Sequence, residues 1–348
     1  VTVLEGETVG RHASSASAGG VRSLNRHPAE IPLARAALPL WRKAATELGS
    51  DVGFQGGGQI RVAIDAPGLE ALEARAALTQ ALGYRHETMI GTNALRAREP
   101  HISPECRGAL TVEDDGFADP LKSIHALLGA ATAAGVVVRE HSPVIGLSGS
   151  NPIAVQTAEG EIAAEFVVNA AGAWGNTLAA MVGEAIPMRA EGLQMSVTEP
   201  MPAFVNAVLG ISGHKLSLKQ TPSGHVVIGG GFFGRMDESG TLARPIPTNV
   251  AKNLSNAARL FPELAHSRVV RSWAGIEGMT EDGLPVVAPS NTMPGLIHAF
   301  AFCGHGFALA PLIGRLVAGM MSGQDAPVPL TPFAVDRFHD RAEERLHA

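Results

Sequence analysis

The 348-residue chain is long enough to bury a large core and to form two domains. Its composition, 45% hydrophobic and 17% charged residues, excludes a disordered protein, and the 40 glycines favour an α/β protein with close backbone contacts. A net charge of −6 without any run of Lys or Arg argues against a nucleic-acid partner. Cys106 and Cys303 form no metal-binding spacing, so we expect no metal site and a reducing, cytoplasmic location.

The chain opens on a short apolar strand, residues 1–5, which ends in Glu5. Dinucleotide-binding folds place an acid at this point to hold ribose hydroxyls, although a solvated Glu at a strand end is the commoner occurrence. A G-x-G-x-x-G turn is expected about 20 residues before such an acid. None precedes Glu5, so we expect either an N-terminal truncation, which we favour, or a fold without this pyrophosphate loop.

Residues 10–22, GRHASSASAGGVR, are small, polar and rich in glycine. Their hydroxyls and free N–H groups suit a diphosphate or a flat ring, and a flexible loop is the alternative. An amphipathic helix is predicted over 28–48. The next predicted elements are a strand over 56–65, helices over 68–82 and 94–99, a strand over 108–116, a helix over 120–134 capped by Asp119, and a strand over 136–139.

Residues 143–174 predict a β-meander that ends in an apolar strand and enters a helix through the small residues NAAGAW. These residues allow a ligand to approach the backbone, or simply allow a helix to pack on a sheet. From 187 to 270 the alternation of apolar and polar residues predicts an antiparallel sheet. Its strands are expected over 193–200, 214–221 and 225–231, with a helix over 249–264.

The stretch 295–323 reads as a buried strand, a Gly-rich turn over 303–306 and a long apolar helix. Free N–H groups at such a helix start favour an anion or an electron-rich ring edge, whereas a ligand-free core is the alternative. His305 and Arg315 interrupt the apolar run, so we expect core rather than a membrane span, with at most a peripheral membrane contact. The tail 331–348 predicts a polar surface helix.

Five segments together resemble the FAD-dependent D-amino-acid oxidase superfamily: ASSASAGGVR, DDGFADPLKSIHALLGAATAAGV, VVNAAGAW, RSWAGIEGMTEDGLPVVAPS and FCGHGFALAPLIGRLVAGMMSG. The resemblance covers essentially the whole chain except the absent N-terminus. That superfamily includes glycine and sarcosine oxidases, D-amino-acid dehydrogenases, and the flavin subunits of opine and hydroxyproline dehydrogenases and of hydrogen cyanide synthase. The resemblance implies an α/β fold with a Rossmann-like FAD domain and an antiparallel-sheet substrate domain. The implied FAD domain comprises 1–50, 100–186 and 272–348, and the substrate domain comprises 51–99 and 187–271.

The resemblance implies FAD as cofactor and assigns residues to it. The implied contacts are Glu5 at the adenosine ribose, Ala13, Ser14, Ala18, Gly19 and Gly20 beside the diphosphate, Val144 at adenine, Ala171, Gly172 and Trp174 along the cofactor, and Gly304, His305, Gly306, Phe307 and Ala308 at the flavin N1/O2 edge. A helix N-terminus stabilises negative charge at that edge, and a protonated His305 would add to the effect.

The implied reaction is oxidation of the C–N bond of an amino acid or secondary amine, with hydride transfer from the α-carbon to flavin N5 and hydrolysis of the imine. The catalytic residues stay unknown, and the substrate-pocket candidates are Glu277, His305 and Lys219. Many relatives carry an Arg for the substrate carboxylate where this chain has Glu277. Glu277 would attract a cationic substrate or pair with a local Arg, which makes glycine a less suitable substrate.

Two features point to a dehydrogenase that works with a partner subunit or electron acceptor. The motif with Glu277 is closer to the opine, hydroxyproline and cyanide-synthase subunits, which have partners. Sarcosine oxidases place an oxygen-activating Lys near the segment that corresponds to 229–234, which contains none. Lys215 and Lys219 precede it, and we expect both at the surface rather than in the pocket. The alternative function is a degenerate or assembly subunit that binds no FAD by itself; a nicotinamide-dependent dehydrogenase fits less well.

Overall fold

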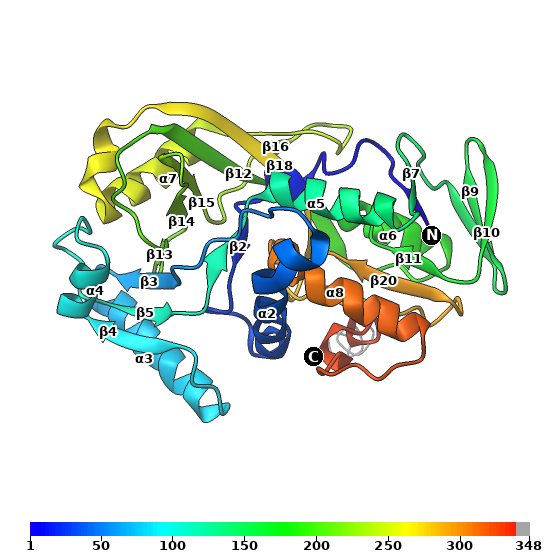
Figure 1. Cartoon of the computed structure of the whole chain (residues 1–348), viewed down its shortest axis with the longest axis horizontal. Coiled ribbons are helices and arrows are strands. Elements are labelled where there is room, and N and C mark those ends of the chain that lie inside the picture. Colours follow the sequence, from blue (N-terminus) through cyan, green and yellow to red (C-terminus); the bar gives the residue numbers. More distant parts are fainter. Residues whose placement is uncertain (339–348) are drawn as a thin grey trace, which may run out of the picture.

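The computed structural model describes residues 1–338, and its largest feature is an eight-stranded sheet (Figure 1). All neighbouring strands in this sheet are antiparallel except β13 and β3, which are parallel. In order across the sheet the strands are β18 (Val269–Thr280), β12 (Met188–Pro200), β15 (His225–Gly229), β14 (Ser217–Gln220), β13 (Val208–Ile211), β3 (Gln59–Ala63), β5 (Gly108–Val112) and β4 (Thr88–Gly91).

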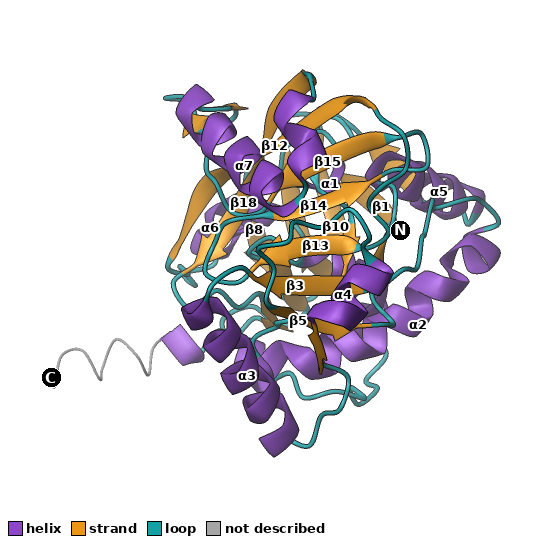
Figure 2. Cartoon of the chain, turned by 90° about the vertical axis from the view of Figure 1, so that its left-hand side faces the viewer, coloured by secondary structure: helices purple, strands orange, loops and turns teal. Residues whose placement is uncertain are grey.

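One face of the sheet forms a closed hydrophobic core. Ile60, Leu209, Leu218 and Ile228 from four strands pack there against Leu260 of helix α7 (Pro247–Leu260). Helix α3 (Ala66–Ala81) packs on β3 and β5 through Leu72, and α4 (Thr92–Arg98) leads back into β5. Figure 2 shows α7, α4 and α3 arranged around these strands.

Two predictions for this sheet need correction. The helix expected over 249–264 is interrupted, because α7 ends at Leu260 and a separate 3₁₀ helix covers Pro262–His266. Pro262 has no N–H to donate and disfavours helical backbone at Phe261. Strand β5 falls inside the segment 100–186 assigned to the FAD domain, yet it hydrogen-bonds β3 and β4 of the large sheet. The domain division otherwise stays a prediction.

The second part of the molecule contains two pairs of parallel strands. Strand β1 (Thr2–Leu4) pairs with β7 (Val137–Arg139), and β11 (Val167–Asn169) pairs with β20 (Leu296–Phe300). Strand β19 (Val286–Pro289) adds to β20 in antiparallel fashion, and the predicted meander is formed by β8 (Gly146–Gly149), β9 (Ile153–Thr157) and β10 (Gly160–Ala164). The α/β fold class is therefore confirmed.

Helices cover these parallel strands. Helix α2 (Ile31–Leu48) packs on α8 (Gly306–Met321), with Leu33 and Ala37 against Leu309 and Leu312. The remaining α-helices are α1 (Ala13–Ala16), α5 (Pro120–Ala133) and α6 (Gly175–Met181). The other 3₁₀ helices cover Pro28–Glu30, Gly172–Trp174 and Thr331–Phe333. The short strands are β2 (Gly20–Val21), β6 (Gly116–Phe117), β16 (Arg235–Met236) and β17 (Ala243–Arg244). As predicted, the Asp119 carboxylate caps α5 by accepting from the N–H groups of Leu121 and Lys122.

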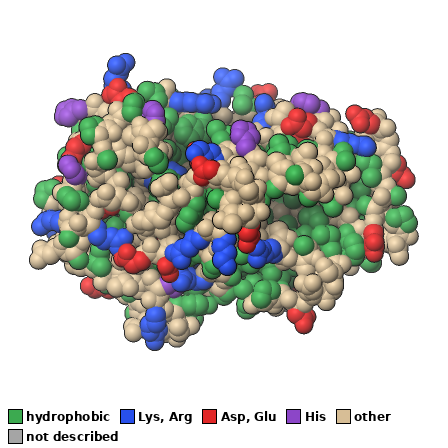
Figure 3. Space-filling view, viewed as in Figure 1, with side chains coloured by type: hydrophobic (Ala, Val, Ile, Leu, Met, Phe, Trp, Pro, Cys, Tyr) green, Lys and Arg blue, Asp and Glu red, His purple; other side chains and the backbone are tan. Residues whose placement is uncertain are grey.

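The predicted helix over 331–348 is only partly testable. The structure shows a single 3₁₀ turn at Thr331–Phe333 and no continuous helix from 331, and residues 339–348 lie outside the described range. Within residues 1–338, no helix combines the length and the apolar content needed to cross a membrane. On the face in Figure 3, basic side chains lie among acidic ones. Arg35 and Arg42, for example, both contact Asp114.

Candidate active site

The second face of the large sheet gathers the predicted pocket residues. The register of the paired strands determines this arrangement, because side chains directly opposite each other on paired strands share a face. Glu277 of β18 pairs with Glu191, and along β12 the same face continues to Val197, which pairs with Val227. Val227 pairs with Lys219 of β14. The sheet thus presents Glu277 and Lys219 on one side, away from the α7 core.

The small-residue stretch after β1 packs directly on this face. Trp273 donates its indole N–H to the carbonyl oxygen of Ala16 at 3.0 Å. A Cβ atom added to Gly275 would lie 2.4 Å from the Cβ of Ala16, and one added to Gly19 would lie 2.1 Å from the carbonyl oxygen of Ala118. These glycines are needed for close packing within the protein. Gly19 also has a φ of +69°, which favours glycine.

Two other predicted glycines are packed less tightly. A Cβ at Gly172, where φ is +56°, would meet no atom within 4 Å, and one at Gly304, where φ is +80°, would come no closer than 3.6 Å to any neighbour. Gly172 begins the 3₁₀ turn of NAAGAW, and Gly304 lies in the turn before α8. Both turns adjoin β18: Gly172 through its carbonyl oxygen beside Gly278, and Gly304 beside Glu277.

The start of helix α8 is fixed by aromatic packing. The ring of Phe307 stacks on that of Trp41, with centroids 4.8 Å apart, and the Trp41 indole N–H donates to the carbonyl oxygen of Ala308 at 2.8 Å. Gly306 opens the helix directly after His305. The first N–H groups of α8 have no partners within the helix, and their positive partial charge favours an anion or a reduced ring edge.

Glu277 lies half-buried beside this helix start. Burial raises the pKa of its carboxyl group to about 7, although the N–H of Gly304 donates to it and opposes the rise. Among the described residues Glu277 has no ion-pair partner, so the predicted local pairing with an Arg is wrong. At neutral pH the side chain is poised between a carboxylate and a carboxylic acid.

His305 is neutral at pH 7, contrary to the idea of a cationic His at this position. Burial, reinforced by the charge of Arg26, lowers its pKa to about 4. Its Nδ1 lies 2.9 Å from Glu30 Oε1. Burial opposes ionisation of Glu30, but the hydrogen bond from His305 and nearby Arg charges leave the Glu30 pKa below its usual value. His305 therefore donates Nδ1–H to a carboxylate and adds no charge.

Lys219 is buried, so the surface location predicted for it is wrong. Its Nζ lies 4.0 Å from the centroid of the Phe117 ring and 3.5 Å from the carbonyl oxygen of Ala118. Burial lowers the Lys219 pKa to about 7. The reason is position: β14 is an inner strand, and residues 19–20 with β6 cover its second face. Lys215, by contrast, is exposed as predicted.

The predicted adenosine contacts lie together at the ends of β1 and β7. Glu5 is half-buried, and its Oε1 accepts the N–H of Glu7 at 2.9 Å. The Glu5 carbonyl oxygen accepts the N–H of Ser142, which brings the loop with Val144 beside the strand end. Trp174, predicted along the cofactor, lies 4.5 Å from His12, centroid to centroid. The roles of these residues stay predictions.

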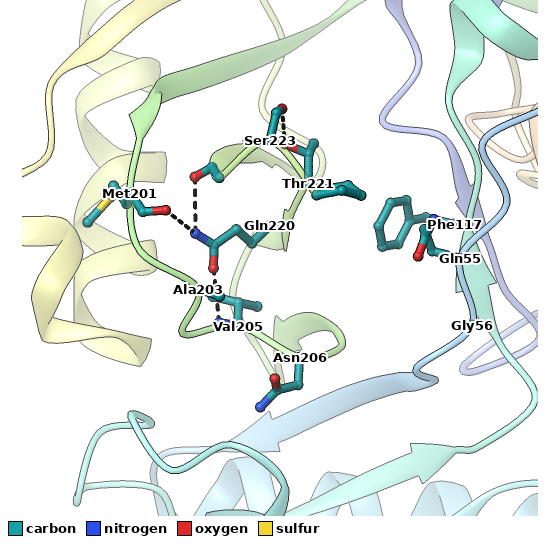
Figure 4. A pocket seen from close by; sticks show the side chains of 12 residues that line it. Gln55, Gly56, Phe117, Met201, Ala203, Val205, Asn206, Gln220, Thr221 and Ser223 are labelled. Carbon is teal, nitrogen blue, oxygen red and sulfur yellow. Dashed lines mark hydrogen bonds between the residues drawn. The ribbon is translucent and has the colours of Figure 1, made fainter.

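A cavity of about 490 Å³ lies between Phe117 and two loops of the large sheet (Figure 4). Phe117 and Gln55 form one wall, and the turns around 201–206 and 221–224 form the other. Gln220 holds these turns together: its Oε1 accepts from Phe204 and Val205, and its Nε2 donates to carbonyl oxygens of the same loops. Phe117 thus borders this cavity and also contacts Lys219.

A basic cluster at the site was not found from the sequence. Arg22, Arg26 and Arg61 come together from the segment after β2 and from β3. The one available signal was Arg61 itself, a charged residue between apolar neighbours in the strand QIRVA. The described residues contain no group of three or more side chains suited to a metal ion.

Comparison with known proteins identifies the family that this sequence matches. The family described as DAO, FAD dependent oxidoreductase, matches residues 1–320. Glycine oxidase from Geobacillus kaustophilus is 30% identical over 348 residues, covering 97% of this chain and 90% of that protein. Hydrogen cyanide synthase subunit HcnC from Pseudomonas protegens is 30% identical over 252 residues, covering 70% and 58%. The crystal structure of L-proline dehydrogenase from P. horikoshii superposes with a TM-score of 0.89 at 25% identity, covering 98% and 91%.

Proposed function

Because this chain belongs to the DAO family of FAD-dependent oxidoreductases, we propose that it oxidises the C–N bond of an amino acid or secondary amine. Membership confirms the expected FAD cofactor, the enzyme class and the Rossmann-like FAD-binding region. The observation that supports the proposed reaction is the loose packing at Gly172 and Gly304 beside β18, where Gly304 adjoins Glu277.

The residues around Gly172 and Gly304 suit the flavin half of FAD. Residues 13–20, 171–174 and 304–308 would hold it, and Glu5 with Val144 would hold the adenosine half. When bound, FAD would supply the acceptor for the hydride of the C–N oxidation, which carries both electrons. The N–H groups at the start of α8 would stabilise the negative charge that the reduced ring carries.

Glu277 has a defined part in this proposal. An amine can give up its α-hydrogen as hydride only when its nitrogen is unprotonated, and a group that titrates near pH 7 is suited to accept the proton from a substrate ammonium. Glu277 meets that requirement through burial. A carboxylate at this position also attracts a cationic amine rather than a free carboxylate. We therefore expect the amine of the substrate to approach Glu277, and its acid group to lie elsewhere.

The electron acceptor is a separate part of the proposal. One similar protein, HcnC, is named as a subunit of a synthase, which supports a partner subunit here. The lack of a Lys within 229–234 is only a weak argument against a reaction with oxygen. Lys219 lies close to that segment, because it pairs with Val227 of β15, the strand that leads into it. We propose a dehydrogenase-type subunit. Identifying the electron acceptor by experiment distinguishes it from an oxidase.

The test starts from the purified protein supplied with FAD. We expect flavin absorbance bands that bleach under anaerobic conditions with at least one member of a panel of D-amino acids, opines, hydroxyproline and sarcosine. Reoxidation by a dye but not by oxygen would identify a dehydrogenase. A colourless protein that does not take up FAD would contradict the proposal and favour the alternative of a non-catalytic assembly subunit.

A further inference from the structure

Glu30 and His305 stand directly before helices α2 and α8, and their side chains bond to each other. A polar side chain at such a position usually accepts hydrogen bonds from the first N–H groups of its own helix, as Asp65 does before α3 and Asp119 before α5. Neither Glu30 nor His305 caps its helix in this way. His305 Nδ1 instead lies 2.9 Å from Glu30 Oε1. The two helix starts are therefore joined, and the N–H groups that open α8 receive no side-chain cap.

Among the described residues, His305 alone donates a hydrogen bond to the Glu30 carboxylate. The Glu30 side chain is fully buried, and its second oxygen, Oε2, has no partner. Nearby Arg26 and Arg22 favour the charged form of Glu30 without forming an ion pair with it. A buried carboxylate with one donor is costly for stability. We infer that Glu30 contributes to the orientation of His305 more than to the stability of the fold.

The contact with Glu30 fixes the tautomer of His305. A carboxylate only accepts hydrogen bonds, so His305 Nδ1 carries a proton and donates it. Burial and the charge of Arg26 lower the pKa of His305 to about 4, so the ring is neutral and its Nε2 is unprotonated. Nε2 makes no hydrogen bond within residues 1–338, and the ring is 20% exposed rather than sealed in the interior. His305 thus presents a free acceptor beside the free donors of α8.

A row of donors next to an acceptor is the complement of an imide edge. The pyrimidine ring of a flavin has such an edge, in which the acceptor C2=O2 adjoins the donor N3–H. The uncapped N–H groups of α8 match O2, and Nε2 of His305 matches N3–H. The opposite tautomer of His305, or its protonated form, would place a donor against N3–H and lose this match.

We propose that Glu30 is a positioning residue of the flavin site, which fixes His305 as a neutral acceptor for the N3–H group of FAD. The proposal rests on the proposed function, because it assigns a contact to the same cofactor. It replaces the sequence-based idea that His305 adds positive charge at the flavin. Glu30 itself touches neither substrate nor flavin, and it acts through the tautomer and the orientation of the His305 ring.

The tautomer is measured by nitrogen NMR on the full chain with isotope-labelled histidine, with and without FAD. The chain has 13 histidines, and the His305 signals are assigned by their absence from His305→Phe. We expect a protonated Nδ1 and an unprotonated Nε2. In Glu30→Gln the amide can donate to Nδ1, so the proton should move to Nε2. The matched control is Glu47→Gln, which breaks the exposed ion pair with Arg315 between the same two helices and should leave the tautomer unchanged. A protonated Nε2 in the natural chain would overturn the proposal.

The flavin contact is measured as the dissociation constants of FAD and of FAD methylated at N3, by fluorescence titration. The natural chain and Glu47→Gln should bind FAD about tenfold more tightly than the methylated form. In Glu30→Gln, and in His305→Phe, which keeps a ring without the acceptor, the FAD dissociation constant should rise about tenfold, while that of the methylated form changes little. Equal losses for both cofactors, or unchanged FAD affinity in both folded variants, would reject the contact alone. If the natural chain takes up no FAD, the proposed function fails together with the contact.

Discussion

Two buried clusters in this molecule each contain a Glu and a His, and they differ in how completely they are paired. In the first, Glu184 accepts from Ser290, from the N–H of Asn291 and from His298 Nε2 at 2.9 Å, and His298 Nδ1 contacts Asn169. In the second, Glu30 contacts His305, but Glu30 Oε2 and Arg26 Nη1 have no partner among the described residues.

The difference follows from location. The Glu184 cluster joins β11 and β20 to the loop after α6, inside the parallel-strand region. The Glu30 cluster lies at the start of α8 and continues through Arg26 and Arg22 to a small cavity beside Arg61. Buried polar groups without partners are rare in folded proteins and concentrate where a ligand completes them. The comparison separates a cluster whose polar groups are all paired from one that is left open beside the proposed site.

The largest effect should come from breaking the closed cluster. Glu184→Ala leaves His298, which is fully buried, and two donors of the 290–291 turn without an acceptor. We expect a loss of about 3 kcal/mol in the free energy of unfolding, measured by urea denaturation. The control is Glu47→Ala, which removes the exposed ion pair with Arg315 and should cost less than about 1 kcal/mol. Equal effects in the two variants would contradict the distinction.

A second prediction concerns pH and the functional region. The Glu277 pKa rises from 4.5 in the unfolded chain to about 7 in the folded one. The stability that its protonated form contributes is therefore complete below pH 4.5 and is lost as pH rises through 7. Glu277→Gln should remove this loss, so that its unfolding free energy exceeds that of the natural chain increasingly between pH 5 and pH 8. Parallel urea curves at four pH values provide the measurement.

The effect of Glu277→Gln on catalysis should be opposite to its effect on stability, so the more stable variant should be the poorer catalyst. If Glu277 accepts the substrate proton, kcat/KM of the natural enzyme should rise with an apparent pKa near 7, and the Gln variant should lose that dependence. Thr280→Val, which alters a buried hydroxyl farther along the same strand, serves as a control for general disturbance of β18. A variant that retains the natural pH profile would exclude Glu277 as the proton acceptor.

Most of the secondary structure could be predicted from the sequence, because the periodicity of apolar residues is a local property. The pairing of strands is not local, which explains why β5 was assigned to the other domain. Alternation in 214–221 identified two faces of a strand, but it could not reveal that residues 19–20 cover the face of Lys219.

The flavin-site residues came from the resemblance to a family, which carries positions such as 304–308 and Glu277 from one sequence to another. Arg22 ends the first of those motifs, but Arg61 lies outside all of them. Their proximity arises only when β3 is placed beside the segment after β2, so the sequence offered no spacing from which to infer it.

The smallest effect should come from the open cluster. Arg26→Met removes a buried guanidinium whose Nη1 has no partner and whose one hydrogen bond, from Nε, goes to the carbonyl oxygen of Arg22 at 3.2 Å. Burial lowers the Arg26 pKa to about 9, which means that the folded chain disfavours its charge. Replacement by an apolar side chain of similar length should therefore change the free energy of unfolding by less than about 1 kcal/mol, or increase it. Arg75→Met is the matched control, because Arg75 makes two hydrogen bonds to the buried Glu87, and its loss should be clearly destabilising. If Arg26→Met destabilised the chain as much as Arg75→Met in urea denaturation, Arg26 would be a structural residue, and the open cluster would not differ in kind from the closed one.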